Sequence, residues 1–432
     1  MWINKENTIF LYTYYPQYKM FIFQGFSILI HKFTSTIIMT IFFINKKEFT
    51  MKITIQREIL VRSVQEVIKA ISFKTTIPIL TGIKFHVTEQ GLTLTGSDAD
   101  ISIESFVPKE ADGDENIMIE QTGSCVFQAR YFYEIVKKLP DTQVQITISK
   151  QQNATIQSGK TEFNLKIWDA EEYPRLPEIN ESCSFYLSVE LLKNIIRQTV
   201  YAVSTSENRP ILTGVNWIFD KETLVCVGTN SHRLAQKIVL QSDPNIQIEV
   251  NPFNIVIPGK SLNELNKLLD GENEQVKVVI TPQQILFQLK NLLFFSRLLE
   301  GNYPDTKKLI PKEMKTKLVV DVKAFHRAID RASLLSKDEK SNIVKLEVND
   351  SCTIFISSNA PEIGKVEEEL SSEHFEGEEL KISFSAKYMM DALKVMDDEK
   401  VEISFTGAMR PFLIKNISND EILELVLPVR TY

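Results

Sequence analysis

The sequence predicts an α+β protein made of three repeated domains, each with two helices packed on β-sheet. Two observations carry this prediction. The stretch Pro78–Asp98 matches Pro210–Asn230 without a gap when it is shifted by 132 positions, and both begin with the five residues PILTG. A fainter third copy follows, so the order helix, strands, helix, strands recurs about every 130 residues. A period of this length is a whole domain and not a solenoid unit.

The matched stretches read as β-hairpins. Apolar residues alternate with polar ones at equivalent positions, which are Ile83, Phe85 and Val87 in the first copy and Val215, Trp217 and Phe219 in the second. A period of two with a turn between the runs is typical of a hairpin with one buried face. The runs IVKLEV (343–348) and CTIFISSN (352–359) are the expected hairpin of the third copy.

Each copy also carries two predicted helices. The first helices lie at 57–72, 189–204 and 321–336, where apolar residues recur at helical spacing. The second helices lie at 129–140, 258–270 and 385–400, and each runs into alternating strands. The three units are therefore expected to share one architecture.

The joins between the copies set the domain limits. Tyr173-Pro174 and Tyr303-Pro304 recur at equivalent places, which gives domains at 51–177, 178–303 and 304–432. Residues 1–50 are expected to be an extension outside the fold, because Met51 opens the first copy. The apolar run 20–44 could instead anchor a three-domain interaction scaffold to a membrane, although His31 and Lys32 interrupt it and an Ala-x-Ala cleavage site is missing.

Composition narrows the class of protein. The 432 residues carry a formal charge of −7, which becomes −10 without residues 1–50 because five basic and two acidic residues are lost. A basic surface, if present, must therefore be local. The four cysteines are far apart and form no CxxC pair, so we predict no disulfide framework, metal site or cofactor, and expect a reducing cytoplasm.

Cations recur on the second helices. Arg130, Lys260 and Lys387 hold equivalent positions, and Lys137, Lys267 and Lys394 follow seven residues later. Seven residues are about two turns, so each pair shares one helix face. The first helices carry a looser set, which comprises Arg62, Lys69, Lys193, Arg197, Lys323, Arg327 and Arg331. A single such face is usually a solvated surface, but six in an acidic protein favour a phosphate backbone as partner.

A device for reading bases does not accompany these cations. The sequence contains no C2H2 finger, RNP-type motif or Gly-rich phosphate loop. Phosphate contacts position a protein without specifying sequence. The predicted binding is therefore sequence-neutral and sensitive to salt.

Short motifs resemble one family across residues 51–430. They are IPILTG (77–82), RPILTG (209–214), TNSHRLA (229–235), GNYPDTKKLIP (301–311) and LVLPVR (425–430). In this order they are similar to the bacterial DNA polymerase III beta subunits, the sliding clamps. The resemblance implies a head-to-tail homodimer that closes into a ring, with helices lining a hole around double-stranded DNA. It also implies a non-catalytic processivity factor that tethers the polymerase catalytic subunit, the clamp loader and other replication and repair proteins.

The resemblance further implies a pocket for client peptides between the second and third domains. Mapped onto this chain, the pocket comprises Leu212, Thr229, Ser231, His232, Arg233, Leu234, Pro304, Lys308, Leu309, Val426, Leu427, Pro428, Val429 and Arg430. Apolar anchors with a few polar groups suit a short extended peptide.

The chain departs from the family at several of these positions. Lys74 stands where the family often has Arg in a loop expected to contact DNA, and Ser231 stands where Gly is common. Leu427 and Val429 replace Met, and Thr431 and Tyr432 follow the motif. These changes keep the pocket apolar and are expected to alter its peptide preference.

A hydrolase is the rival hypothesis. Ser231 and His232 lie near Asp220 and Glu222, but adjacent residues at a strand end point to opposite faces. The sequence has no nucleophile elbow or metal cluster. We therefore expect no catalysis.

Overall fold

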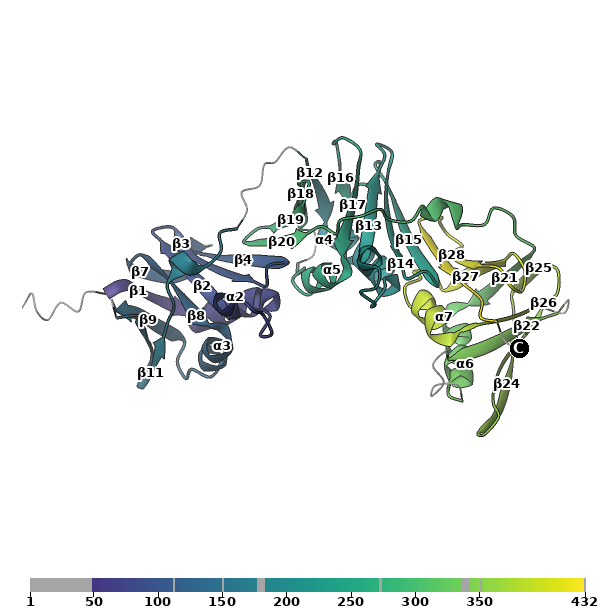
Figure 1. Ribbon diagram of the computed structural model, residues 1–432, viewed down its shortest axis with the longest axis horizontal. Coiled ribbons are helices and arrows are strands. Elements are labelled where there is room, and N and C mark those ends of the chain that lie inside the picture. Colours follow the sequence, from purple (N-terminus) through teal and green to yellow (C-terminus); the bar gives the residue numbers. More distant parts are fainter. Residues whose placement is uncertain are drawn as a thin grey trace, which may run out of the picture.

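The computed structural model describes residues 49–111, 113–149, 151–176, 183–271, 274–335, 342–349 and 352–430. The expected extension, apart from its last two residues, and its apolar run 20–44 lie outside this part of the chain, as do Thr431 and Tyr432. Three similar units follow one another along an arc, and their helices lie on its concave side (Figure 1). We call this side the inner face.

The first unit begins at a strand two residues upstream of Met51. Its strands are β1 (Phe49–Gln56), β2 (Gly82–Thr88), β3 (Gly91–Ser97), β4 (Ile101–Pro108), β5 (Glu110–Ala111), β6 (Asp114–Glu115), β7 (Ile117–Gln121), β8 (Gly123–Gln128), β9 (Gln143–Ser149), β10 (Asn153–Ser158) and β11 (Thr161–Lys166). Its helices are α2 (Arg57–Val67) and α3 (Ala129–Lys137), with 3₁₀ turns η1 (Ile68–Ala70), η2 (Pro78–Thr81) and η3 (Ala170–Glu172).

The second unit repeats this order. Its strands are β12 (Ser184–Ser188), β13 (Gly214–Phe219), β14 (Thr223–Thr229), β15 (Arg233–Leu240), β16 (Ile246–Gln247), β17 (Phe253–Pro258), β18 (Gln275–Ile280), β19 (Gln284–Leu289) and β20 (Leu292–Arg297). Its helices are α4 (Val189–Thr199) and α5 (Gly259–Asn266), with 3₁₀ turns η4 (Val200–Ala202) and η5 (Pro210–Thr213).

The third unit has the same order of elements, which confirms the prediction of a third copy of the repeat. Its strands are β21 (Thr316–Asp321), β22 (Ile343–Val348), β23 (Thr353–Ala360), β24 (Gly364–Ser371), β25 (His374–Gly377), β26 (Leu380–Ser385), β27 (Lys400–Phe405), β28 (Phe412–Asn416) and β29 (Ile422–Val426). Its helices are α6 (Val322–Ser333) and α7 (Ala386–Leu393), and the 3₁₀ turn η6 (Thr306–Lys308) precedes it.

The repeated PILTG has the same structure in both copies. Pro78 and Pro210 each open a 3₁₀ turn, and the glycine begins the next strand. Proline suits the first position of such a turn because its fixed φ matches the helical value. The joining tyrosines then return to this strand: the hydroxyl of Tyr173 donates to Gly82 O at 3.5 Å, and that of Tyr303 donates to Gly214 O at 3.4 Å. The linkers are thus attached in equivalent ways.

Close packing of helix on sheet explains a second repeated glycine. A Cβ built on Gly96 would lie 2.4 Å from Val67 O, and one built on Gly228 would lie 2.4 Å from Thr199 O. Real Cβ atoms do not come this close to a carbonyl, so in the first two units the first helix can approach its hairpin this closely only over glycine. The predicted apolar positions of both hairpins are buried.

Strand pairing joins the three units into one body. One nine-stranded sheet runs β16-β12-β18-β19-β20-β4-β3-β2-β8, so β20 of the second unit pairs with β4 of the first. A second nine-stranded sheet runs β17-β13-β14-β15-β29-β28-β27-β21-β25 and pairs β15 with β29 across the next junction. The two outer sheets end in β11 and β24, which lie at opposite ends of the arc (Figure 1).

The predicted α+β architecture of three repeated units is confirmed. Among the described residues, no helix is both long and apolar enough to cross a membrane. The membrane hypothesis rests on residues 20–44, which lie outside this part of the chain.

Candidate nucleic-acid interface and peptide pocket

The predicted DNA-contacting cations lie on the helices of the inner face or next to them. Lys74 is the exception, because it lies in the turn between η1 and η2. Eleven of these side chains are exposed, namely Arg62, Lys74, Arg130, Lys137, Arg197, Lys260, Lys267, Arg327, Arg331, Lys387 and Lys394. Lys69 and Lys193 are half-buried, and burial lowers the pKa of the Lys69 ammonium.

Three of the cations join neighbouring domains. Across the junction of the first and second domains, the Lys260 ammonium lies 2.9 Å from an Asp98 carboxylate oxygen, and the Lys69 ammonium donates to Lys267 O at 3.2 Å. The Arg197 guanidinium lies 2.6 Å from Asp397 and donates to Val395 O at 3.1 Å, across the next junction. These three side chains therefore help to align the domains as well as adding charge to the inner face.

Other cations are paired within their own domain. Lys267 lies 2.7 Å from Glu264, Arg62 lies 3.4 Å from Glu66, and Arg331 binds Glu368 through two nitrogens. Exposed pairs of this kind contribute only about 0–1 kcal/mol each, so they are easily exchanged for other partners.

A third group has no carboxylate partner among the residues that the structure describes. It comprises Lys74, Arg130, Lys137, Lys193, Lys323, Arg327, Lys387 and Lys394, and only Lys137 has a ring contact, with Tyr133. These free cations give the inner face of an acidic chain a local positive potential.

The predicted peptide pocket centres on the turn between β14 and β15. Ser231 has a φ of +72°, in the left-handed region that favours glycine. The Asn230 side chain supports this turn, because its Oδ1 accepts the backbone N–H groups of His232 and Arg233, each at 3.0 Å. Ser231 thus adopts a backbone conformation that glycine reaches easily, which would explain why the family commonly has glycine at this position.

The C-terminal segment lies beside this turn. Leu427 donates its backbone N–H to His232 O at 3.0 Å, and Val429 donates to Ser383 O at 2.7 Å. Leu427, Pro428 and Val429 are half-buried, whereas His232 and Arg430 are exposed. The predicted C-terminal and hairpin parts of the pocket are therefore brought together.

An apolar surface continues from the C-terminal segment to the linker. Leu427, Ile310 and Met314 pack, partly buried, on a cluster that includes Leu234 and Leu425. Leu309 is exposed, as are Pro304 and Lys308, whose ammonium lies 3.0 Å from Asp305. Leu212, Thr229, Leu234 and Val426 are buried, and of these Leu234 belongs to the cluster under this surface.

Arg233 is buried at the domain junction. Its guanidinium lies between the rings of Tyr201 and Tyr388, 4.9 and 4.6 Å from their centroids. It also lies 2.7 Å from Asp391 and donates to Tyr201 O. Because Arg233 begins β15, this contact attaches the pocket turn to the third domain.

A buried carboxyl completes this junction. The Tyr201 hydroxyl donates to Glu424 of β29, whose side chain is shielded from solvent. Burial raises the pKa of the Glu424 carboxyl well above its usual range, although Tyr201 and Arg233 oppose the shift. Burial likewise raises the pKa of the Tyr201 hydroxyl. Burial therefore favours the neutral form of Glu424 in the folded protein.

The hydrolase hypothesis finds no geometric support. Asp220 is used in its own turn, where Oδ1 accepts the backbone N–H groups of Glu222 and Thr223 at 3.2 and 2.9 Å. These hydrogen bonds lower the pKa of the Asp220 carboxyl. In the described ranges, no group of three or more His, Cys, Asp or Glu residues could hold a metal ion.

The sequence was compared with protein families and with known proteins. Sequence models of the N-terminal, central and C-terminal domains of the DNA polymerase III beta subunit match residues 51–177, 186–305 and 307–430. The beta sliding clamp of Bacillus subtilis (strain 168) is 56% identical over 382 residues, which are 88% of this chain and all of that one. The beta sliding clamp of Staphylococcus aureus is 46% identical over the same shares.

Solved structures agree with the sequence comparison. The Bacillus subtilis DNA polymerase sliding clamp has a TM-score of 0.86 and covers 89% of this chain and all of its own. A Pseudomonas aeruginosa sliding clamp bound to griselimycin has a TM-score of 0.81 at 27% identity, over 88% of this chain and all of its own.

Fold and inner face together define a three-domain protein of the clamp class. The chain belongs to the DNA polymerase III beta subunit family, whose relatives above are sliding clamps.

Sequence reasoning missed two parts of the site. Ile310 lies within the motif GNYPDTKKLIP and Met314 three residues after it, but neither was assigned to the pocket, and only their packing on the cluster around Leu234 reveals them. The Tyr201, Tyr388 and Asp391 contacts with Arg233 join separate domains and leave no local pattern. Glu424 did leave a signal, because a carboxyl within the apolar run ILELVLP must be neutral or paired.

Glu424→Gln should make stability less dependent on pH. The folded carboxyl keeps its proton above the ordinary value of 4.5, so the stabilisation present below pH 4.5 is lost as pH rises through the folded pKa. Glutamine can accept the Tyr201 hydrogen bond without titrating. We therefore expect the melting temperature of the variant, relative to wild type, to rise between about pH 5 and pH 9. An equal difference at both pH values would show that folding does not raise the pKa of Glu424.

Proposed function

We propose that this chain is a DNA sliding clamp, which closes as a head-to-tail dimer around double-stranded DNA and tethers the replicative polymerase. The observation that carries the proposal is the arc of three joined domains, with cations on its inner face and with the edge strands β11 and β24 at its two ends (Figure 1). A ring holds DNA by topology, so it needs little affinity and no base contacts. Its role is to tether, and catalysis belongs to its partners.

Ring closure would repeat the pairing of the two internal junctions. Phe294 of β20 lies opposite Ile103 of β4, and Glu424 of β29 lies opposite Ala235 of β15. The repeats of Phe294 and Ala235, each 131 positions away, are Phe163 on β11 and Val366 on β24. Phe163 would therefore lie opposite Val366 of the partner subunit. A head-to-tail contact of this kind closes when the rotation completes a circle.

The inner face would meet the phosphate backbone. We assign DNA contacts to the predicted set, which is Arg62, Lys69, Lys74, Arg130, Lys137, Lys193, Arg197, Lys260, Lys267, Arg327, Arg331, Lys387 and Lys394. The unpaired members are available directly, and the members in exposed ion pairs can exchange their partners at little cost. Such contacts make binding salt-dependent through counterion release.

The surface around Leu309 and Leu427 would capture client peptides. An exposed apolar side chain beside half-buried ones offers anchors for an extended segment. The griselimycin complex of the Pseudomonas aeruginosa clamp supports the idea that members of this family bind ligands. We assign the polymerase catalytic subunit and the clamp loader to this surface. Because the four cysteines are free thiols, we place this activity in the cytoplasm.

Retention on circular DNA tests the clamp directly. After loading onto nicked circular plasmid, the protein should stay bound through gel filtration at moderate salt. It should be lost once the plasmid is cut, because a ring slides off a free end. Equal retention on both forms would mean ordinary affinity binding and would overturn the proposal.

Phe163→Asp should convert the dimer to a monomer. Phe163 is 38% exposed on the free edge strand β11, and a charge there would be buried against the partner's Val366. Met118→Asp is the matched control, because Met118 is 50% exposed on β7, the opposite edge of the same sheet. Light scattering after gel filtration measures the mass. A dimer in the Phe163 variant would place the subunit contact elsewhere.

Leu309→Asp should weaken binding of the DNA polymerase III catalytic subunit at least tenfold, which corresponds to about 1.4 kcal/mol. Leu309 is 49% exposed, so the fold should be unaffected. Leu240→Asp is the control, since Leu240 is 53% exposed at the far end of β15. Surface plasmon resonance with the immobilised catalytic subunit gives both affinities. Unchanged binding by the Leu309 variant would exclude the linker from the pocket.

A further inference from the structure

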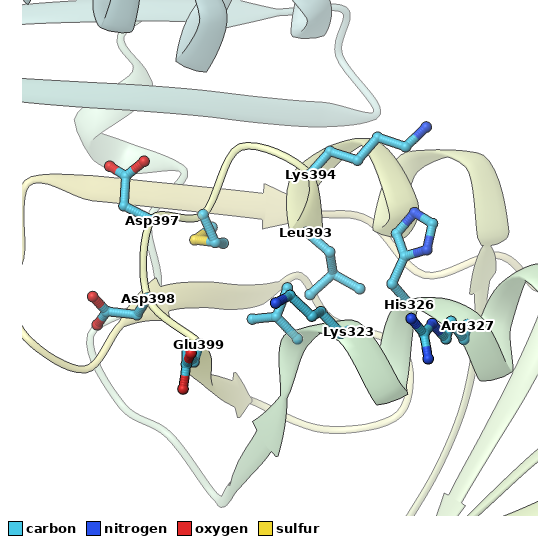
Figure 2. A pocket seen from close by; sticks show the side chains of 10 residues that line it. Lys323, His326, Arg327, Leu393, Lys394, Asp397, Asp398 and Glu399 are labelled. Atoms are coloured by element: carbon cyan, nitrogen blue, oxygen red, sulfur yellow. The ribbon is translucent and has the colours of Figure 1, made fainter.

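The third domain has an open cavity on the helix side, and two residues of its lining, Arg327 and Lys394, belong to the set assigned to DNA above. It has a volume of about 430 Å³ and lies between the beginning of α6 and the end of α7. Leu393 and Met396 supply its apolar lining, and Lys323, His326, Arg327 and Lys394 supply its basic lining. Figure 2 shows His326, Arg327 and Lys394 on one side of the cavity, and Asp397, Asp398 and Glu399 on the other.

The acidic side of the cavity is largely committed to other contacts. Asp397 accepts from Arg197 at 2.6 Å and from Gln198 Nε2 at 2.9 Å. Asp398 accepts the backbone N–H groups of Ile417 and Ser418, each at 2.8 Å. Glu399 is exposed at the rim, on the side away from Lys394 (Figure 2).

The basic side is uncommitted. Lys323, Arg327 and Lys394 have no carboxylate within ion-pair distance among the described residues. Lys323 and Arg327 are four residues apart on α6, so they are neighbours on one helix face. By contrast, the groove between α4 and α5 contains Lys193 and Arg197, and Arg197 is already held by Asp397. The cavity of the third domain therefore gathers more free positive charge than this groove.

His326 adds a hydrogen-bond donor to this cavity. Its Nε2 is buried and has no partner among the described residues, so a proton there would be an unsatisfied buried donor. The neutral tautomer with the proton on Nδ1 avoids this cost. Burial and the nearby Lys394 ammonium lower the pKa of the imidazole, against the opposing effect of Asp330 and Asp391.

We propose that this cavity is a phosphate seat, in which Lys323, Arg327 and Lys394 bind phosphate groups of one DNA strand and His326 donates a hydrogen bond from Nδ1. The proposal rests on the clamp function and adds one defined site of DNA contact in each third domain. Phosphate oxygens accept from ammonium, guanidinium and imidazole groups alike, and guanidinium can bind them with two parallel hydrogen bonds.

The test is equilibrium binding of the full-length dimer to a short fluorescent DNA duplex over a range of KCl concentrations. Losing one phosphate contact flattens the plot of log K against log salt by about 0.9, which is about an eightfold loss of affinity at 0.1 M salt. We expect this change for Lys323→Ala, Arg327→Ala and Lys394→Ala separately. Lys381→Ala is the control, because it removes the same charge from β26 of the same domain, where Lys381 pairs with Glu347 at 3.0 Å. Slopes equal to that of the control in all three variants would overturn the seat.

His326 is tested by a pair of variants. His326→Ala should weaken duplex binding, and His326→Asn should restore it, because the Asn amide N–H lies where the imidazole Nδ1–H lies. Equal loss in both variants would assign His326 to packing and overturn its role as donor.

Two further measurements separate the possible failures. Inorganic phosphate binding, followed by ³¹P line broadening without DNA, identifies the source of the ligand. If the wild-type protein binds phosphate, if Arg327→Ala abolishes this binding, and if the slope for DNA is unchanged, the cavity binds free phosphate. This result would overturn the proposed DNA contact. Wild-type protein that is not retained on nicked circles would instead overturn the clamp function.

Discussion

Strand pairing across the domain junctions is the constraint on which the rest of this structure depends. β20 continues the sheet of the first domain, and β29 continues that of the second, through registers of five residue pairs each. Backbone hydrogen bonds and buried apolar residues then fix the angle between neighbours, as they do between strands within a domain. Because each junction uses equivalent strands, every domain turns in the same sense, and the helices stay on one side of the arc (Figure 1).

The charges of the inner face follow from this arrangement. An acidic chain can hold DNA only where its cations are gathered, and the turn between domains gathers them without raising the net charge. Part of this charge is used in the fold itself. Lys260 and Arg197 each reach a carboxylate of a neighbouring domain, so the face that would meet phosphate also holds the junctions together. In the cavity between α6 and α7, Asp397 and Asp398 are occupied by other contacts, whereas Lys323, Arg327 and Lys394 have no carboxylate partner among the described residues.

Local pattern made most of the fold predictable. The alternation of apolar and polar residues predicted the hairpins, and apolar residues at helical spacing predicted the two helices of each domain. The repeated PILTG marked where the first two hairpins begin. Pairing between domains could not be predicted in the same way, because a strand edge has no sequence signature for the edge it joins. For the same reason Arg233 was expected in the pocket, although its guanidinium lies between Tyr201 and Tyr388 at the junction. A side chain's type can be read from sequence, but its partner depends on which domains meet.

The two internal junctions also show why a peptide surface would form at the second and not at the first. After β20 the chain follows its own domain, since Leu299 donates its backbone N–H to Val256 O of β17 at 2.9 Å. After β29 the chain instead crosses the turn of the neighbouring domain through Leu427 and then binds Ser383 through Val429. This path leaves Leu427 half-buried beside Ile310 and Met314 of the linker. The pseudo-symmetry that builds the arc is thus broken where one segment departs from its equivalents, and this departure creates the apolar surface.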